Sequence, residues 1–425
     1  MDDGPIQEIP ADGGMLSVTE KNRGKMDAGG VQSLNRQNTI ALAKRLIANV
    51  KAGTGTLADG VMEVDTATYN DPVLYEKELR AIFDRLPFVA GLSSDLAKPG
   101  DFLNINEFGT PILVTRTKDG VVKGFVNSCR HRGSALVFCP RGQSPGGFSC
   151  PYHGWSYNLD GKLLGVAHPA DFGPVDKSEL GLVEIQVEER HGLIFCATMP
   201  GATFDLDEYL GEEMQQELAQ WNIGELSHAK TGPIALDGNW KLTLEAFLEV
   251  YHFEVTHKNN LAQVAFGDAT EIRTLGKHVF FGIPLKSILE LETIPEEEWV
   301  PEKHIMFGYM LYPGILMNIT PIIMAFYSLY PIALNKSGVR HSIYARLDMS
   351  QPENRALGEQ TWDSSNGIVQ REDYPFGITS PQQGIYRQAV PKFLFGRNEL
   401  GLQHMLGVTQ QMLAAAEEDQ GGGGL

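Results

Sequence analysis

Apolar side chains recur at helical spacing in several parts of the chain. Between Ile40 and Val50 they are spaced three or four residues apart, after a possible N-cap at Asn38 or Thr39, which predicts a first helix. Similar patterns predict helices over residues 71–86, 205–227, 240–252 and 385–418. In the 240–252 segment the apolar positions surround most of the helix, so we expect that helix to be buried.

Two other regions carry the signals of β-strands. Between residues 87 and 200 short extended runs are joined by tight turns, with Asp119-Gly120 and Asp160-Gly161 as two hairpin signals. Strand patterns also dominate from about residue 270 to 348. The most apolar stretch, 305–334, is broken by prolines and by Gly314 into pieces too short to cross a membrane, so we interpret it as buried strands.

Composition narrows the class of protein. The chain has 425 residues, which predicts two or three domains, and its formal charge of −18 argues against nucleic acid or an anionic membrane as a partner. Its 4 cysteines are too few for a secreted disulfide framework, and no signal-peptide pattern precedes residue 38, so we expect a cytoplasmic location. Residues 1–37 are predicted to be a flexible arm and 419–425 a flexible tail.

A cysteine and histidine pattern stands within the first strand-rich region. CRHRG covers residues 129–133 and CPYHGW covers 150–155, so that each loop contributes one Cys and one His. Such a set suits either tetrahedral zinc or a [2Fe-2S] cluster with two histidine ligands. Zinc sites usually pair like ligands in each loop, whereas two mixed loops can close over a two-iron cluster from opposite sides. The pattern therefore favours the cluster.

A second pattern of potential ligands follows about ninety residues later. Glu245, Glu249 and His252 are spaced four and three residues apart, and on one continuous helix they would share a face. His257 would lie about 140° away from His252 on that helix. Both histidines can bind one metal only if the helix ends or carries a π-bulge between them. Two histidines and one carboxylate would form the facial triad of non-heme iron oxygenases, with the carboxylate coming from elsewhere in the chain.

Taken together, the two patterns resemble the oxygenase component, or alpha subunit, of the Rieske non-heme iron oxygenases, also called aromatic-ring-hydroxylating oxygenases. The resemblance implies that Cys129 and Cys150 hold one iron of a [2Fe-2S] cluster and that His131 and His153 hold the other. It also implies a mononuclear Fe(II) on His252, His257 and an acidic residue. That residue is expected in an E-D pair followed by a glutamine, which selects Asp373 upstream of Gln382 or Gln383, with Glu372 and Asp363 as alternatives.

The resemblance assigns Glu249 a catalytic role as the bridge between the mononuclear site and His153 of a neighbouring subunit. Glu245 is the alternative bridge, or else a buried partner of a nearby Lys or Arg. Tyr152 occupies the place where related electron-transfer proteins carry a second bracing cysteine. We therefore expect no disulfide there, and we interpret Cys139 and Cys196 as small buried apolar residues.

The fold implied is α+β. We expect helices in residues 38–86 to pack on the catalytic domain, an all-β Rieske domain over 87–200, and a catalytic domain over 201–418 with an antiparallel sheet packed by helices, of the helix-grip type. The resemblance further implies a homotrimer, with or without β subunits, that receives electrons from NAD(P)H through a reductase or ferredoxin.

The activity implied is the use of O2 to hydroxylate or dihydroxylate a small-molecule substrate. The run 308–334 lacks Lys, Arg, Asp and Glu, and it favours a hydrophobic, aromatic substrate if part of it lines the pocket rather than only the sheet core. The alternative activity is monooxygenation that ends in O- or N-demethylation of a small methylated compound.

Overall fold

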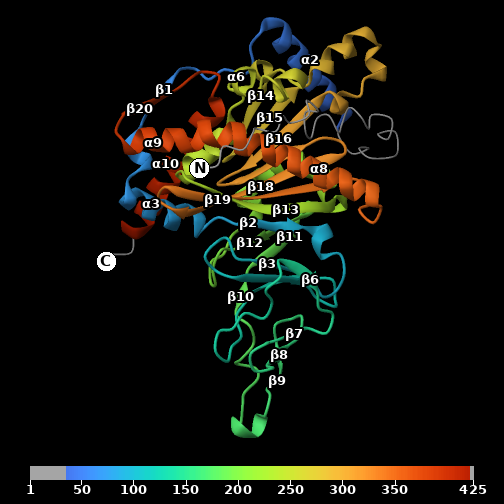
Figure 1. Cartoon of the computed structure of the whole chain (residues 1–425), viewed down its shortest axis with the longest axis vertical. Coiled ribbons are helices and arrows are strands. Elements are labelled where there is room, and N and C mark those ends of the chain that lie inside the picture. Colours follow the sequence, from blue (N-terminus) through green and yellow to red (C-terminus); the bar gives the residue numbers. More distant parts are fainter. Residues whose placement is uncertain (1–34, 422–425) are drawn as a thin grey trace, which may run out of the picture.

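In the computed structural model, which describes residues 35–421, two structural units are stacked along the long axis of the molecule (Figure 1). The upper unit is built on a seven-stranded antiparallel sheet surrounded by helices, and the lower unit consists of short antiparallel strands. The predicted α+β class, with a small β domain and a larger domain of antiparallel sheet and helices, is confirmed.

The large sheet has the strand order β13-β19-β18-β17-β16-β15-β14. Its strands are β13 (Ser227–Leu236), β14 (Glu271–Leu275), β15 (His278–Pro284), β16 (Ile305–Leu311), β17 (Ile315–Ile319), β18 (Ile323–Ala333) and β19 (Lys336–Ala345). Along β18 the side chains alternate between two cores, with Ala325 and Tyr327 in one and Met324 and Phe326 in the other. Both faces of the sheet are therefore buried, which explains the nearly continuous apolar run and confirms its interpretation as buried strands.

Different elements cover the two faces of this sheet. On one face lie α5 (Trp240–Leu248), α8 (Pro352–Ile368) and the π-helical segment η11 (Val369–Thr379), which contact one another or the strands β13, β18 and β19. On the other face lie α2 (Arg36–Ala52) and α4 (Leu206–Ala219). The remaining helices of this unit are α3 (Pro72–Glu78), α6 (Phe253–Thr256), α7 (Leu261–Val264), α9 (Ser380–Tyr386) and α10 (Leu400–Gly421).

The lower unit contains three small sheets. The first has β3 (Asp101–Ile105), β4 (Ile112–Arg116), β5 (Val122–Val126), β6 (Arg141–Gln143) and β10 (Glu184–Ile185); the second has β2 (Phe88–Leu92), β11 (Val187–Arg190) and β12 (Leu193–Cys196); the third has β7 (Phe148–Ser149), β8 (Ser156–Tyr157) and β9 (Leu163–Gly165). β4 and β5 pair across Asp119-Gly120, and β8 and β9 pair across Asp160-Gly161. Both predicted hairpins are confirmed.

The two units share one of the hydrophobic cores. Val89 of β2 and Phe195 of β12 belong to the same buried cluster as Phe307 and Phe326 of the large sheet. The Arg340 guanidinium on β19 also donates hydrogen bonds to the carbonyl oxygens of residues 89 and 90, at 2.9 and 3.0 Å. Because apolar packing and hydrogen bonds both cross the boundary, the lower unit is held firmly against the sheet.

The helix boundaries differ from the predictions at both ends of the described chain. Asn35, not Asn38 or Thr39, caps α2, and its side chain accepts hydrogen bonds from the backbone nitrogens of residues 37 and 38. The first turn of α2 is exposed and therefore carries no apolar signal. Residues 1–34 of the predicted arm lie outside the described residues.

The predicted helix over 385–418 is interrupted. The short strand β20 (Lys392–Phe395) pairs with β1 (Met62–Asp65), which is distant in sequence, and α10 begins only at Leu400. α10 then continues to Gly421, so the first residues of the predicted tail are helical, and residues 422–425 lie outside the described part. Within residues 35–421, the structure has no helix that is both long and apolar enough to cross a membrane.

Candidate metal centres

Two loops of closely similar geometry carry the CRHRG and CPYHGW motifs. In the first, the amide of Gly133 donates to the carbonyl of Cys129 at 2.9 Å, and in the second, the amide of Gly154 donates to the carbonyl of Cys150 at 2.9 Å. Both glycines have positive φ, 76° and 71°, a conformation that glycine adopts without strain. The loops therefore turn sharply just after each pair of potential ligands.

The ligand side chains of the two loops converge. Cys129 and Cys150 are both buried, and a hydrogen bond joins their thiols. The rings of His131 and His153 have centroids 4.7 Å apart, and the buried Nδ1 atom of His131 has no hydrogen-bond partner among residues 35–421. Two neighbouring thiols on one side and two neighbouring imidazoles on the other form the donor set of a [2Fe-2S] cluster with mixed ligation.

The surroundings favour the thiolate form of a ligand cysteine. Burial raises the pKa of Cys150. Hydrogen bonds from the backbone amides of His153 and Tyr152 and from Cys129 lower this pKa by a larger amount, so the net shift is downward. The hydroxyl of Tyr157 lies 3.3 Å from Cys129 Sγ and accepts a hydrogen bond from the amide of Arg130. Hydrogen bonds of this kind to the sulfur atoms tune the reduction potential of a bound cluster.

The other two cysteines differ from each other. All four cysteines of the chain are free thiols. Cys196 is fully buried on β12, in agreement with the interpretation of this residue as a small apolar side chain. Cys139 is exposed, and its interpretation as a buried residue was wrong. It lies in the loop that leads from the first cluster motif into β6, and a loop at the surface offers no core for its side chain.

The second motif does not lie on one continuous helix. α5 ends at Leu248, and Glu249 has an extended backbone with φ −114° and ψ 148°. His252 then precedes the short helix α6, and His257 directly follows it. The predicted end of a helix between the two histidines exists, because α6 stops at Thr256, and a further break that was not predicted lies before Glu249. The prediction that Glu245, Glu249 and His252 share one helical face is therefore wrong, since Glu245 alone of the three is on α5.

This broken segment brings both histidines to one point, where Asp373 meets them. The Nε2 atoms of His252 and His257 are 3.1 Å apart, and Asp373 Oδ1 lies 3.2 and 3.1 Å from them. Ligand atoms about 2.1 Å from one ion, in directions at right angles, lie about 3.0 Å apart, so the three atoms match adjacent coordination positions. They are the one such set in the described part of the chain.

Each histidine is oriented by a second carboxylate. The Nδ1 atom of His252 lies 2.5 Å from Glu249 Oε1, and the Nδ1 atom of His257 lies 2.7 Å from Glu372 Oε2. A carboxylate that accepts a hydrogen bond from the Nδ1–H group leaves Nε2 without a proton and free to bind a metal. Asn260 donates hydrogen bonds to Glu372 at 3.0 Å and holds that carboxylate in place.

Electrostatics favours a positive charge between the three donor atoms. Burial lowers the pKa of His252, but hydrogen bonds to Asp373 and Glu249 outweigh it and raise that pKa to about 9. Burial raises the pKa of Asp373, and its hydrogen bonds with His252 and His257 lower it by more. A site that stabilises a proton on His252 beside ionised carboxylates also attracts a metal cation, which would displace that proton and bind the neutral imidazole.

The alternative ligands predicted from the sequence lie elsewhere. Glu372 points to Nδ1 of His257, away from the three convergent atoms. Asp363 is exposed and pairs with Lys230 at 2.6 Å. The E-D pair can serve two purposes because consecutive residues of a helix do not face the same way. The role of Glu372 as a partner of His257 and the role of Asn260 were both missed, and no pattern in the sequence marks Asn260.

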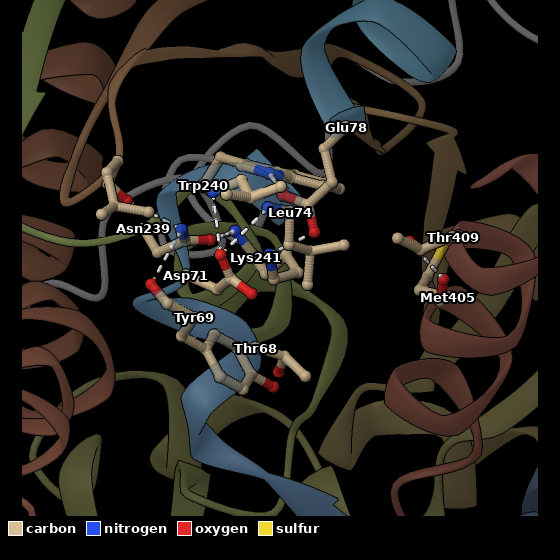
Figure 2. Close-up of polar contacts among 12 residues, drawn as sticks. Thr68, Tyr69, Asp71, Leu74, Glu78, Asn239, Trp240, Lys241, Met405 and Thr409 are labelled. Carbon is tan, nitrogen blue, oxygen red and sulfur yellow. Dashed lines mark hydrogen bonds and ion pairs between the residues drawn. The ribbon is translucent and has the colours of Figure 1, made fainter. Parts of the chain in front are cut away.

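Helix α5 is anchored at its start by a buried polar network. The Lys241 ammonium pairs with Glu78 of α3 at 2.5 Å, and the indole of Trp240 donates to the same carboxylate at 2.8 Å. Figure 2 shows Lys241 between Tyr69 and Glu78, with Asn239 and Trp240 beside it. Asn239 caps α5, and its backbone amide donates to Gln382 of α9 at 2.8 Å. The helix that leads into the metal site is thereby tied to two other elements.

Glu245 is partly buried on α5 and accepts a hydrogen bond from the hydroxyl of Tyr69 at 2.6 Å. Its hydrogen-bond partner is therefore a tyrosine, and Lys241 of the same helix, a nearby lysine of the kind that the second alternative names, acts on it through charge alone. Burial raises the pKa of Glu245 to about 8. Because it faces Tyr69, whereas Glu249 contacts His252, Glu249 is the better candidate for the bridge.

An apolar cavity of about 110 Å³ adjoins the three donor atoms. Its walls come from α5, from the broken segment after it, from β15–β18 and from α8 and η11. Phe247, Phe253, Phe281, Leu316 and Tyr327 supply much of the surface. A concave, mostly apolar space beside a potential metal site is the arrangement expected of a substrate pocket.

Comparison with known proteins identifies both units. The family model described as Rieske [2Fe-2S] domain matches residues 87–177, and the model described as ring hydroxylating alpha subunit (catalytic domain) matches residues 211–415. Together they cover well over half of the chain. The chain belongs to the Rieske ring-hydroxylating oxygenases. The resemblance inferred from the sequence motifs is confirmed, as are the two cofactors of the family, a [2Fe-2S] cluster and a mononuclear iron.

Similar proteins act on different substrates. The chain is 30% identical over 211 residues to the anthranilate 1,2-dioxygenase large subunit of Acinetobacter baylyi, which covers 48% of this chain and 45% of that protein. It is 32% identical over 245 residues to a glycine betaine monooxygenase oxygenase subunit of Pseudomonas aeruginosa, covering 56% and 54%. These matches span about half the length of the curated relatives.

Solved structures share the fold. The quaternary ammonium Rieske monooxygenase CntA in complex with L-carnitine aligns with a TM-score of 0.69 at 22% identity, covering 84% of this chain and 95% of that one. Naphthalene 1,2-dioxygenase with bound indole aligns with a TM-score of 0.65 at 21% identity, covering 83% and 92%. The arrangement of the two units is therefore that of the oxygenase structures.

The raised pKa of Glu245 predicts a pH dependence of stability. In the folded chain this pKa is about 8, above its ordinary value of 4.5, so the favoured folded form is protonated. The stabilisation that comes from protonated Glu245 is complete below pH 4.5 and is lost progressively as the pH rises to 8. Glu245→Gln keeps a neutral acceptor for Tyr69 and should remove this loss.

We expect the thermal unfolding midpoint of Glu245→Gln to exceed that of the parent by an amount that grows between pH 5.5 and 8 and then levels off. The control is Glu63→Gln, at an exposed carboxylate, for which no such growing difference is expected. A difference that stays constant across this pH range would contradict the buried, protonated state of Glu245.

The contact between Glu372 and His257 predicts a role in metal retention. Glu372→Ala should weaken mononuclear iron binding by about 10- to 100-fold, because the imidazole loses the carboxylate that orients it. The visible spectrum of the cluster should be unchanged, because its ligands lie in the other unit. Iron titration of protein stripped of its mononuclear metal measures the effect.

Asp363→Ala serves as the matched control for this experiment. It removes a carboxylate of the same helical region that faces solvent and pairs with Lys230. Iron affinity should be unaltered in this variant. Equal losses in the two variants would show that general charge, and not the contact with His257, holds the metal.

Proposed function

We propose that the chain is the terminal oxygenase of a Rieske oxygenase system. The observation that carries this proposal is the convergence of His252, His257 and Asp373 beside an apolar cavity, in a chain that also has the paired Cys and His loops. In this proposal Cys129, Cys150, His131 and His153 hold the cluster, and the three convergent residues hold the iron. Electrons from NAD(P)H reach the cluster through a reductase or ferredoxin.

When bound, the iron supplies oxygen activation and the cluster supplies electrons. The chain itself positions these groups and the substrate. Glu249 and Glu372 keep a proton on Nδ1 of each histidine, so that both Nε2 atoms face the metal position. The aromatic and aliphatic walls of the cavity exclude water and hold an apolar substrate next to that position.

The lining of the cavity supports hydroxylation or dihydroxylation of a hydrophobic, aromatic substrate. An apolar surface with few polar groups selects by shape and by burial of the substrate's own apolar area. The second candidate is O- or N-demethylation of a small methylated compound. The similarity to a glycine betaine monooxygenase subunit favours this alternative, and the small volume of the cavity is compatible with it.

The positions of the two centres support assembly into a head-to-tail homotrimer, with or without β subunits. In Figure 1 the β7–β9 sheet beside the cluster loops lies at the lower end of the molecule, whereas α6 of the mononuclear site lies near the top. Electron transfer between centres so far apart would be slow within one chain. A heterologous contact that closes after three subunits gives each iron a cluster from its neighbour.

Exposed apolar side chains mark both ends of such a contact. Phe138, Tyr152 and Phe172 are exposed in the unit that carries the cluster loops, and Tyr251, Val255 and Phe376 are exposed close to the histidine site. Both oxygens of Glu249 already accept hydrogen bonds from His252. A carboxylate has about four acceptor positions, so Glu249 can also accept one from His153 of the neighbouring chain.

Turnover experiments test the oxygenase function. Purified protein should be red-brown, and anaerobic reduction followed by exposure to O2 with a panel of aromatic and methylated compounds should yield oxygenated products by mass spectrometry. His252→Ala should keep the cluster spectrum but lose mononuclear iron and product. Product formation by this variant at the parental rate would refute the assignment of the triad.

Mixed assemblies test the path of the electron. His252→Ala removes the iron site and Cys150→Ser removes the cluster, so neither chain alone has both centres. Trimers that contain both variants, purified through two different affinity tags, have one complete pair among their three contacts. They should show about one third of the parental activity. In a head-to-tail ring built from these two variants, only one of the three contacts places an intact cluster next to an intact iron site.

The control trimers combine two differently tagged copies of His252→Ala and should be inactive. Inactive mixed trimers with both metal centres present at the expected ratio would contradict electron transfer between subunits.

A further inference from the structure

The cavity beside the histidine site contains one side chain whose polar group has no partner. Asn318, on β17, lines the cavity, and its Oδ1 atom is buried without a hydrogen bond in the described part of the structure. The two other neutral polar residues of the lining are satisfied, since the hydroxyls of Tyr327 and Ser365 bond each other at 3.1 Å. A buried carbonyl without a partner is unfavourable, which points to a ligand that completes it.

The sheet presents this amide to the cavity. Side chains two residues apart on a strand share a face, so Asn318 and Leu316 point the same way, and both line the cavity. Across the sheet, Asn318 lies opposite Gly308 and Ala325. Neither neighbour has a side chain long enough to reach the amide, and the ring of Phe281 covers Gly308. The amide therefore lies in the wall of the cavity, and the neighbouring strands supply no side chain that can bond its carbonyl.

The charges of the lining exclude some substrates. No Lys or Arg is among the lining residues that the structure describes, and the two carboxylates present, Glu249 and Asp373, both contact His252. Apart from a bound iron, whose two positive charges these carboxylates offset, an anionic substrate would meet no cation in the lining. Glycine betaine also lacks an N–H or O–H group and would leave the carbonyl of Asn318 unpaired.

The size of the cavity limits the number of rings. Its volume is about 110 Å³. A dry apolar cavity of about 150 Å³ in another protein binds benzene, so a space of this order holds one six-membered ring and little more. A fused two-ring compound would have to displace the walls.

We propose that the substrate is a neutral single-ring aromatic compound with one hydrogen-bond donor, such as a hydroxyl or an amino group, and that Asn318 accepts this hydrogen bond. The contact sets the orientation of the ring and so determines which carbon faces the three donor atoms. This inference rests on the proposed oxygenase function, because it assigns the cavity to the substrate. Asn318 is in this view a specificity-determining residue.

Anaerobic binding to the holoenzyme tests the inference apart from turnover. The probes are phenol, aniline, toluene, anisole and glycine betaine, with dissociation constants measured by calorimetry. The parent should bind phenol and aniline about tenfold more tightly than toluene and anisole, which fill the same space without a donor. Asn318→Leu, of similar volume, should abolish this preference while cluster absorbance and iron content stay at parental values.

Asn398→Leu makes the same substitution at an exposed residue before α10 and should keep the parental preference. The regiochemistry of any oxygenated phenol or aniline should become mixed in Asn318→Leu and stay single in Asn398→Leu. If Asn318 served only to stabilise the fold, the regiochemistry of the product would not change in Asn318→Leu.

The other possible results would contradict either the role of Asn318 or the proposed oxygenase function. A preference that survives in Asn318→Leu, tighter binding of glycine betaine than of every ring probe, or no binding of any ring probe would overturn the inference. If the donor preference depends on Asn318 but no compound is ever oxygenated, the proposed function fails and the binding inference stands. If toluene is oxygenated as readily as phenol by the parent, the function stands and the inference fails.

Discussion

The mononuclear site depends on the placement of helix α5, and a buried ion pair fixes the first turn of that helix. Lys241 and Glu78 are only 4% and 1% exposed, and removing either partner would leave a lone charge in the core, which typically costs about 3 to 5 kcal/mol. α3 and α5 therefore cannot separate without a large loss of stability. Burial lowers the pKa of Lys241, and the charge and hydrogen bond of the Glu78 carboxylate oppose that shift.

From this anchored start the helix continues to Leu248, where the chain changes to an extended conformation. A continuous helix would have directed His252 and His257 to different sides. The extended residue Glu249 and the single turn of α6 instead allow both imidazoles to meet Asp373. η11 supplies Asp373 from a stretch of π-helix that contains Pro375, a residue that lacks the N–H of a regular α-helical hydrogen bond. Both sides of the site thus rely on departures from regular helix.

Much of this arrangement could be predicted from the sequence, because some signals are local. Asp-Gly turns specify hairpins through backbone conformation, and the spacing of cysteines and histidines in two loops is a property of the motif itself. The choice of Asp373 over Glu372 came from the resemblance to the oxygenase family, which implies an acidic ligand in an E-D pair upstream of a glutamine. The structure brings Asp373 to the histidines and places Glu372 one step further out, against Nδ1 of His257.

What could not be predicted depends on contacts between distant segments. The apolar pattern of 240–252 continues past Leu248, because the residues after the helix are also partly buried, so hydrophobicity does not reveal where α5 stops. β20 lies in a segment with helical periodicity and becomes a strand only because β1 pairs with it. Asn260 and Asn318 are ordinary polar residues in the sequence. Asn260 matters because it bonds the carboxylate of Glu372, and Asn318 matters because it lines the cavity beside the histidines. In both cases the surroundings come from distant parts of the sequence.

The same broken segment separates two approaches to His252. On one side lies the apolar cavity with Asn318, and on the other a second opening of about 150 Å³ is lined by Thr256, Glu372 and Phe376. Glu249 and His252 line both spaces. In the proposed trimer, Glu249 bonds Nδ1 of His252 and would link that histidine to the neighbouring subunit through this second opening and not through the substrate pocket. Under this proposal the walls of the apolar cavity can change without changing the contact between Glu249 and His252.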